Sequence, residues 1–141
     1  MSNEPSKAVL DASILIQTLI QEEYTDTALK LVGTLKAIYA PSLILYEIGN
    51  ALVILTRKEL ITKEDAIRKF KFLSAIPTLN IQDIELTKAM DIAMKLKTTL
   101  YDASYLALAL ETDIPLITAD EQLYKKGKTI AKVIHASQVT L

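Results

Sequence analysis

The stretch from Thr99 to Asp120 constrains the fold more than any other part of this sequence. From Asp102 onward, apolar residues recur three and four positions apart, which predicts a helix with one side against a core. The residues in this pattern are Ala103, Leu106, Ala107 and Leu110. Residues 114–117 then form a short apolar run, typical of a strand buried on both faces, and Asp120 follows it closely. In parallel α/β sheets, ligands bind beyond the carboxyl ends of the strands, so both acids can reach one crevice.

Short apolar segments alternate with helical patterns along the whole chain. The predicted strands cover residues 7–11, 37–40, 78–82, 114–117 and 131–135. The predicted helices cover residues 14–20, 25–36, 41–58, 62 to a stop at Pro77, 84–97, 102–112 and 121–126. Parallel strands need a crossover between them, usually a helix, so this alternation predicts one three-layer α/β/α domain over residues 1–141 with a central parallel sheet. Residues 1–6 are polar and are expected to be disordered.

Several local features refine these predictions. Ser13 is expected to be the N-cap of helix 14–20, and Pro41 is expected in the first turn of helix 41–58. Helix 84–97 is expected to face inward with Leu86, Ala89, Met90, Ala93 and Leu96. Helix 41–58 is apolar nearly all round, which indicates packing against the sheet on one side and against another protein on the other.

The composition narrows the classes of function. Half of the residues are hydrophobic, and we interpret part of this excess as surface covered by a partner. Because residues 43–55 are apolar around most of their predicted helix, we expect a homodimer that leaves some apolar surface free for another protein. The absence of cysteine excludes disulfides, thiolate nucleophiles and cysteine-ligated metals. The net charge of -1 argues against a globally basic nucleic-acid binder, although a local basic patch can still bind a phosphate backbone. The candidate basic residues are Arg57, Lys58, Lys63, Arg68, Lys69, Lys71, Lys125, Lys126 and Lys128.

No membrane or targeting segment is predicted. The most hydrophobic run, residues 43–55, is too short to span a bilayer and contains Glu47 and Asn50. The N-terminal apolar stretch lacks a basic leader and is interrupted by Asp11. We therefore expect a cytoplasmic protein with no membrane contact.

Four carboxylates stand in apolar surroundings: Asp11, Glu47, Asp102 and Asp120. Each has a structural alternative, since Asp11 fits a turn, Asp102 and Asp120 fit helix N-caps, and Glu47 with Asn50 fits a narrow polar stripe. Taken together, they map to the carboxyl side of the predicted strands or to the helices that follow. Two carboxylates about 5 Å apart repel by on the order of 3 kcal/mol at an effective dielectric near 20, so such a cluster needs a cation or protons. A hard divalent ion that prefers oxygen ligands, Mg²⁺ or Mn²⁺, fits this requirement.

Four ordered motifs resemble those of the PIN-domain ribonucleases, most closely the VapC-type toxins of toxin-antitoxin pairs. They are residues 9–13 (VLDAS), 47–52 (EIGNAL), 101–109 (YDASYLALA) and 116–120 (LITAD). The resemblance implies a central five-stranded parallel sheet, an acidic pocket for Mg²⁺ or Mn²⁺, hydrolysis of single-stranded or looped RNA, and an antitoxin protein as partner. By position, the family's acids match Asp11, Glu47, Asp102 and Asp120, and its supporting hydroxyls match Ser13 and Thr118. Asn50, on the same helix face as Glu47, is a further supporting candidate.

Hydrolysis by metal-activated water at such a site does not need a histidine. The one histidine, His135, lies near the C-terminus in a predicted edge strand, and metal-activated water needs no histidine base. We expect cleavage to leave a 5′-phosphate and a 3′-hydroxyl, with Ser13 and Thr118 supporting the acids. The tyrosines Tyr24, Tyr46, Tyr101 and Tyr105 either stack on bases or cover the core.

Two alternatives to a toxin stay open. One is a non-catalytic PIN-like module that binds a protein, and the other is a general RNA-processing nuclease. A phosphotransfer receiver or an aspartate-nucleophile phosphatase needs a second acid after Asp11, where the sequence has Ala12 and Ser13. A dinucleotide-binding domain needs a glycine-rich loop, which three scattered glycines do not supply.

Overall fold

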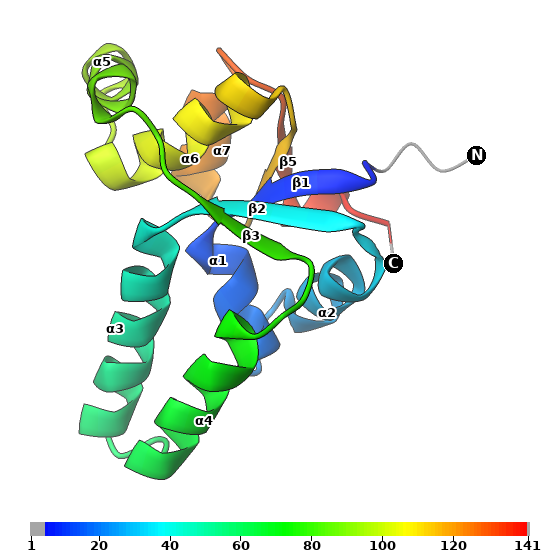
Figure 1. Ribbon diagram of the computed structural model, residues 1–141, viewed down its shortest axis with the longest axis vertical. Helices are drawn as coiled ribbons and strands as arrows, with labels where there is room; N and C mark the ends of the chain where they lie inside the picture. Colours follow the sequence, from blue (N-terminus) through cyan, green and yellow to red (C-terminus); the bar gives the residue numbers. More distant parts are fainter. Residues whose placement is uncertain (1–4, 141) are drawn as a thin grey trace.

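A five-stranded parallel sheet forms the centre of the computed structural model, which describes residues 5–140 (Figure 1). The strand order is β3-β2-β1-β4-β5. The strands are β1 (Lys7–Leu10), β2 (Ala37–Pro41), β3 (Leu79–Gln82), β4 (Leu116–Thr118) and β5 (Val133–His135). The predicted α/β/α architecture with a parallel sheet is therefore confirmed.

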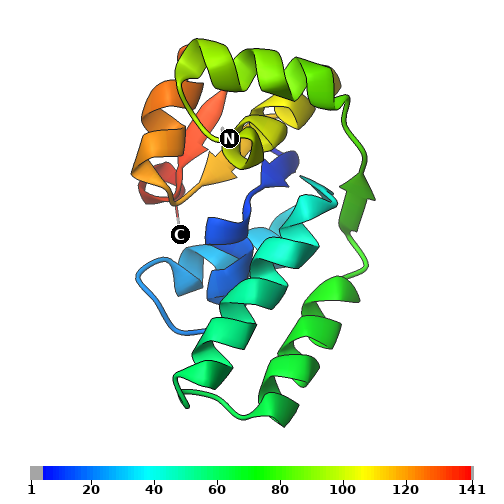
Figure 2. The ribbon, with the colours of Figure 1, turned by 90° about the vertical axis from the view of Figure 1, so that its left-hand side faces the viewer.

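Helices cover both faces of this sheet. They are α1 (Ala12–Leu15), α2 (Thr25–Thr34), α3 (Leu43–Arg57), α4 (Lys63–Ser74), α5 (Leu86–Leu96), α6 (Leu100–Thr112) and α7 (Glu121–Gly127), with the 3-10 turns η1 (Ile16–Thr18) and η2 (Ala136–Gln138). Figures 1 and 2 show α1 to α4 on one side of the sheet and α5 to α7 on the other, with α3 and α4 projecting as a hairpin. The sequence predicted disorder for residues 1–6, of which residues 1–4 lie outside the described residues. The backbone carbonyl of Ser6 accepts a hydrogen bond from the Lys36 N–H at 2.8 Å.

The strand order places the candidate acids. The chain runs from β1 outward to β2 and β3, then returns through α5 and α6 to β4 on the other side of β1. The carboxyl ends of β1 and β4 therefore flank the point where the order reverses, which is where doubly wound sheets bind ligands. Asp11 follows β1 and Asp120 closely follows β4. Helix α6 precedes β4, so its first turn, with Asp102, starts at this same edge.

Three predicted helix starts are wrong. Ser13 is not an N-cap, because Asp11 takes that position and α1 begins at Ala12. Pro41 is the last residue of β2, and α3 begins two residues later. Asp102 does not open α6, because the hydroxyl of Thr99 is the N-cap and accepts the Asp102 N–H at 3.0 Å. A side chain that lies inside a helix can thus look like its cap when another residue has already taken the cap position.

The predicted inward faces of α5 and α6 also need correction. In α5, Ala89 is fully buried, but Leu86 and Met90 are 58% and 48% exposed. In α6, Leu110 is 46% exposed although its pattern predicted burial. Helix α5 packs chiefly against α6, and because α6 itself covers the sheet, only a narrow strip of α5 is enclosed.

Helix α3 is less enclosed than its sequence predicted. Its fully or almost fully buried residues are Ile44, Ile48 and Leu52, on one side only. It lies mainly against α4 and α1 and not broadly on the sheet. The second, outer side of α3 carries exposed apolar side chains, so a partner on that side stays a prediction.

One close approach in the core depends on glycine. Gly127 ends α7 and is buried where α7 crosses α6 and β5. A β-carbon added there would lie 2.6 Å from Leu106 Cδ2 and 3.2 Å from Val133 Cγ2. Leu106 is fully buried, so it has little room to move away.

We predict that Gly127→Ala destabilises the fold by about 1–3 kcal/mol, the usual cost of overpacking a filled core. Gly33→Ala is the matched control: a β-carbon at Gly33 in α2 meets nothing within 4 Å. That substitution should be neutral or stabilising by up to about 1 kcal/mol, because alanine is the better helix former. Urea unfolding followed by circular dichroism measures both, and equal stabilities for the two variants would contradict the close approach.

Candidate active site

Asp11 occupies the centre of the candidate site. It follows the central strand β1 at the N-cap position of α1 and is 5% exposed. Its Oδ1 accepts a hydrogen bond from Ser13 Oγ at 2.6 Å, and its Oδ2 accepts one from Thr118 Oγ1 at 2.7 Å. Both oxygens of a buried carboxylate are thus held by hydroxyl groups from different elements. Of the three supporting residues predicted from the sequence, Ser13 and Thr118 contact this acid.

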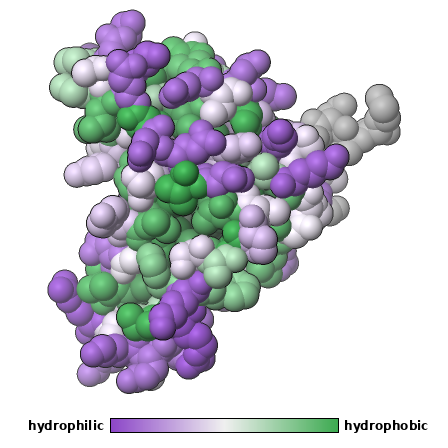
Figure 3. Space-filling model, in the orientation of Figure 1, coloured by the Kyte–Doolittle hydropathy of each residue, from purple (hydrophilic) through white to green (hydrophobic). Residues whose placement is uncertain are grey.

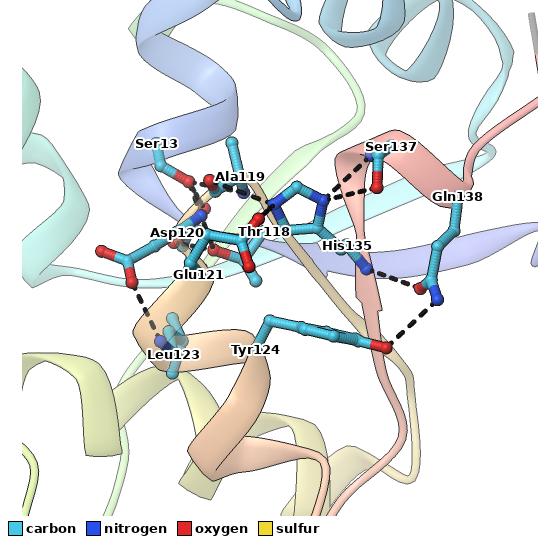
Figure 4. A network of polar contacts seen from close by, with 11 residues as sticks. Ser13, Thr118, Ala119, Asp120, Glu121, Leu123, Tyr124, His135, Ser137 and Gln138 are labelled. Carbon is cyan, nitrogen blue, oxygen red and sulfur yellow. Dashed lines mark hydrogen bonds and ion pairs between the residues drawn. The ribbon is translucent and has the colours of Figure 1, made fainter.

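The same two hydroxyls also hold the segment that follows β4. Ser13 Oγ accepts the Ala119 N–H at 2.9 Å, and Thr118 Oγ1 accepts the Asp120 N–H at 3.0 Å. Figure 4 shows these contacts converging where α1, β4 and the start of α7 meet. The position of Asp120 is therefore linked to that of Asp11 through two short hydrogen-bond chains.

Burial makes Asp11 a weak acid. Removal from water is the main cause that raises its pKa from 3.8 to about 7, and the hydrogen bonds from Ser13, Thr118 and the Ile14 backbone oppose this rise. The nearby charge of Asp120 makes a smaller contribution to the same rise. Within residues 5–140, the charged side chain that acts on the pKa of Asp11 is therefore another acid.

Glu47 is held by a residue that the sequence did not identify. The Tyr105 hydroxyl donates a hydrogen bond to Glu47 Oε1 at 2.6 Å. The Tyr105 ring is almost fully buried, so of the two roles weighed for it, covering the core is the one found. Burial and the charge of Asp102 raise the pKa of Glu47, and the Tyr105 hydrogen bond opposes that rise. Burial, followed by the bond to Glu47, raises the pKa of Tyr105, so it remains a donor.

Asp102 lies in the first turn of α6 and is half-buried. Its pKa is raised mainly by burial and then by the charge of Asp120, whereas the Thr98 hydroxyl and the charge of Lys126 lower it. The Thr98 contact is long, at 3.4 Å. Lys126 reaches over from α7 and donates to the Lys97 carbonyl at 2.7 Å, which keeps its ammonium group near this acid.

Asp120 is both a helix cap and a member of the acidic group. Its Oδ1 accepts the Leu123 N–H at 2.9 Å, so the structural alternative for this residue is realised. A carboxylate has about four acceptor positions, so capping leaves most of its capacity unused. Because Asp120 acts electrostatically on both Asp11 and Asp102, and Asp102 acts on Glu47, the four acids form one repelling series.

The donor set fits a hard divalent cation. All four groups offer carboxylate oxygens, the ligands that Mg²⁺ and Mn²⁺ prefer, and their charges repel one another. As the side chains stand, no group of three or more acidic, histidine or cysteine residues within 5–140 closes around one point. The role of Asp11, Glu47, Asp102 and Asp120 as joint ligands therefore stays a prediction that the observed charges support.

The family model of the PIN domain matches residues 8–129. The chain belongs to the PIN domain family. It is 30% identical over 124 residues to Ribonuclease VapC3 of Pyrobaculum aerophilum, covering 85% of this chain and 94% of that protein. The crystal structure of PAE2754 from the same organism superposes with a TM-score of 0.72 at 25% identity, covering 93% of this chain and 91% of that chain. A toxin-antitoxin complex from Klebsiella pneumoniae shares the fold, with a TM-score of 0.67 at 21% identity and coverage of 94% and 99%.

The remaining candidates lie around this PIN-domain site. Asn50 is exposed and lines a groove between α3 and α4, so its supporting role stays a prediction. His135 ends the edge strand β5, as expected, but its ring is buried beside Ala119.

None of the helices within residues 5–140 combines the length and apolarity of a membrane span.

We predict that Asp11→Asn stabilises the metal-free protein at neutral and higher pH. Because the folded-state pKa is raised from 3.8 to about 7, the wild-type chain is favoured when this acid is protonated and loses stability as pH rises from about 4 to about 7. Asparagine keeps the shape without the charge. At 1.36 kcal/mol per pKa unit, the difference in unfolding free energy between variant and wild type should grow by roughly 3 kcal/mol from pH 5 to pH 8.

Denaturant unfolding in excess chelator at both pH values measures this difference. Asp91→Asn is the control, since Asp91 is an exposed acid on α5 paired with Lys95 at 3.0 Å. Its unfolding free energy should differ from that of the wild type by less than about 1 kcal/mol at both pH values, because exposed ion pairs contribute little. A difference for Asp11→Asn that does not change between the two pH values would show that the Asp11 carboxylate is not strained by burial.

Proposed function

We propose that this PIN-domain protein is an endoribonuclease that requires Mg²⁺ or Mn²⁺ and acts as the toxin of a toxin-antitoxin pair in the cytoplasm. The observation that carries the proposal is the buried Asp11 carboxylate, which two hydroxyl groups hold in place and on which the charge of a second acid, Asp120, acts. Membership of the PIN family and the similarity to a VapC ribonuclease support the same chemistry.

Asp11, Glu47, Asp102 and Asp120 would hold the metal. When bound, it would supply a Lewis acid for the scissile phosphate and lower the pKa of water at neutral pH. The protein's part is orientation: Ser13 and Thr118 fix both oxygens of Asp11, and Tyr105 fixes one oxygen of Glu47. Groups that orient ligands in this way typically change metal affinity or activity when they are removed.

We predict that the purified protein cleaves RNA with Mg²⁺ or Mn²⁺, leaves 5′-phosphate ends, and stops in excess EDTA. Asp11→Asn should lower the rate at least 100-fold, because it removes a ligand charge, while the folded protein stays at least as stable. Cleavage of a labelled structured RNA, followed on a gel, measures this. Cleavage that persists in excess EDTA, or in freshly purified Asp11→Asn, would refute the metal mechanism.

Two alternatives remain distinct from this function. A non-catalytic PIN-like module does not need a buried acid held by two hydroxyls, and it is not expected to bind Mn²⁺. Titration with Mn²⁺ by calorimetry therefore distinguishes it from a metal-dependent nuclease. A general processing nuclease differs in its targets. Mapping new 5′-phosphate ends in cells that express the wild type or Asp11→Asn distinguishes one dominant site in a structured RNA from scattered ends in messages.

The basic side chains proposed for RNA contact have partners of different kinds within the chain. Several are already held by this chain: Arg68 pairs with Asp65 at 3.0 Å, and Lys69 donates to the Leu19 carbonyl at 3.1 Å. Lys128 lies over the Tyr124 ring at 4.8 Å. The charge of Lys126 acts on Asp102, so this lysine lies near the acids. We therefore expect salt-sensitive RNA binding with selectivity for RNA shape.

An apolar groove between α3 and α4 is the proposed antitoxin site. It has a volume of about 640 Å³ and is lined by Leu45, Tyr46, Gly49, Asn50, Leu52, Val53, Thr56, Arg57, Lys63, Ala66, Ile67 and Phe70. Such a groove suits the apolar face of a peptide segment, and the two cations at its margin suit a neighbouring acid. In Figure 3, apolar surface gathers over the middle of the face seen in Figure 1, between hydrophilic ends.

The homodimer was expected from the sequence on residues 43–55, but the surface we propose for it lies on α5 and the start of α6. Leu86, Met90 and Met94 follow one another at four-residue spacing along the outside of α5, and Leu100 and Tyr101 continue the exposed apolar surface at the start of α6. We call these five residues the α5 stripe. The charges along α5 pair within the helix, Lys88 with Glu85 and Lys95 with Asp91. An apolar surface whose neighbouring charges are already paired within one helix is suited to contact the same surface of a second copy across a two-fold axis.

We predict a dimer at micromolar concentration that Met94→Glu converts to a monomer. Met94 is 71% exposed, so the substitution should leave the fold intact while it places a charge in the α5 stripe. Val53→Glu, in the α3–α4 groove, is the control and should remain dimeric. Light scattering measures both. A monomeric wild type refutes the dimer, and a monomeric Val53→Glu beside a dimeric Met94→Glu assigns the interface to α3.

A further inference from the structure

His135 lies beside the segment that carries Asp120, although the proposed reaction gives it no part. The residue is 4% exposed and is the last of β5, where the register pairs it with Thr118 of β4. A buried polar ring must use its nitrogens, because an unsatisfied polar group inside a protein is costly. The partners of these nitrogens therefore indicate what the ring does.

The two ring nitrogens have different partners (Figure 4). Nδ1 accepts the Ser137 N–H at 3.1 Å and lies 2.8 Å from Ser137 Oγ. Because a backbone N–H can only donate, Nδ1 is an acceptor and the proton of the neutral ring is on Nε2. Nε2 lies 3.3 Å from the Ala119 carbonyl oxygen and 3.2 Å from Glu121 Oε1. The Nε2 proton is thus directed at the start of α7.

The Ala119 peptide groups are held from two sides. On one side Ser13 Oγ, from α1, accepts the Ala119 N–H at 2.9 Å, and on the other His135 Nε2, from β5, reaches its carbonyl oxygen. The next N–H, of Asp120, donates to Thr118 Oγ1. The backbone that sets the direction of the Asp120 side chain is therefore fixed by three side chains.

The imidazole has little freedom to turn away. The rings of Tyr24 and Tyr124 contact it edge-on, each with its centroid 5.6 Å from that of the imidazole. The Gln138 side chain accepts the His135 N–H at 2.9 Å and donates to the Tyr124 hydroxyl at 3.1 Å. Residues of the turn η2 and of helix α7 thus both restrict the orientation of the ring.

We propose that His135 is a positioning residue: its Nε2 proton holds the Ala119 carbonyl and thereby fixes Asp120 relative to Asp11. The inference rests on the proposed function only for the role of Asp120 as a metal ligand. Loss of groups that orient metal ligands usually weakens metal binding 10–100-fold, and a contact made through the backbone belongs at the lower end of that range.

Two substitutions in the full chain separate the functions of the ring nitrogens. His135→Asn keeps an acceptor that can cap the Ser137 N–H, as asparagine does at helix N-caps, but it is too short to reach Ala119. His135→Gln places an amide N–H near the position of Nε2. Amide hydrogen exchange, resolved by residue, is measured for Ala119, Asp120 and Leu123 and compared with Val9 in β1. Mn²⁺ affinity is measured by calorimetry on the same proteins.

In His135→Asn we expect exchange at residues 119–123 to quicken about tenfold with Val9 unchanged, and the Mn²⁺ dissociation constant to rise about tenfold. His135→Gln should restore most of both. The proposal fails if exchange at 119–123 stays as in wild type, if it quickens equally at Val9, if His135→Gln restores nothing, or if Mn²⁺ affinity is unchanged. A wild type that binds no Mn²⁺ refutes the proposed function instead, and local exchange alone then decides the role of His135.

Discussion

The hydrogen bond from Thr118 Oγ1 to Asp11 Oδ2 joins the two strand ends on which the site depends. Thr118 is fully buried in β4 and Asp11 follows β1, so this 2.7 Å contact crosses the point where the strand order reverses. Without a strong acceptor at Asp11, the buried threonine hydroxyl would lose its partner, which costs about 1–3 kcal/mol. The Thr118 hydroxyl therefore needs an acceptor oxygen at position 11 for stability, and an asparagine side chain could supply one without the negative charge.

This arrangement holds charges that the fold itself does not need. Burial and the neighbouring acids raise the pKa values of Asp11, Glu47 and Asp102, so in the absence of a cation each ionised group costs stability. The hydrogen bonds from Ser13, Thr118 and Tyr105 offset part of that cost while fixing where the oxygens lie. Proteins retain such strained charge chiefly where chemistry or binding uses it.

The sequence predicted the architecture well because the alternation of strands and helices has few topological solutions. The family resemblance indicated Ser13 and Thr118 as supporting hydroxyls, but Thr118 was expected beside Asp120, two residues away, and its hydrogen bond to Asp11 across the sheet was not predicted. The sequence missed Tyr105 as the partner of Glu47, because these residues are 58 positions apart and neither local pattern indicates the contact. It placed Met90 inward, because helical periodicity shows an apolar face but not whether a neighbouring helix is wide enough to cover it.

The precision of the site comes from the core more than from loops. Helix α6 carries Asp102 in its first turn and Tyr105 one turn later, on a helix that packs against β1, β2 and β4. A rotation of α6 would move one acid and the partner of another together, and it would also expose Leu106 and Leu108, which are buried. Because well-packed interiors shift little, the buried face of α6 sets the spacing between Asp102 and Glu47. Sites built on helices and strands in this way hold their groups more closely than sites built on loops.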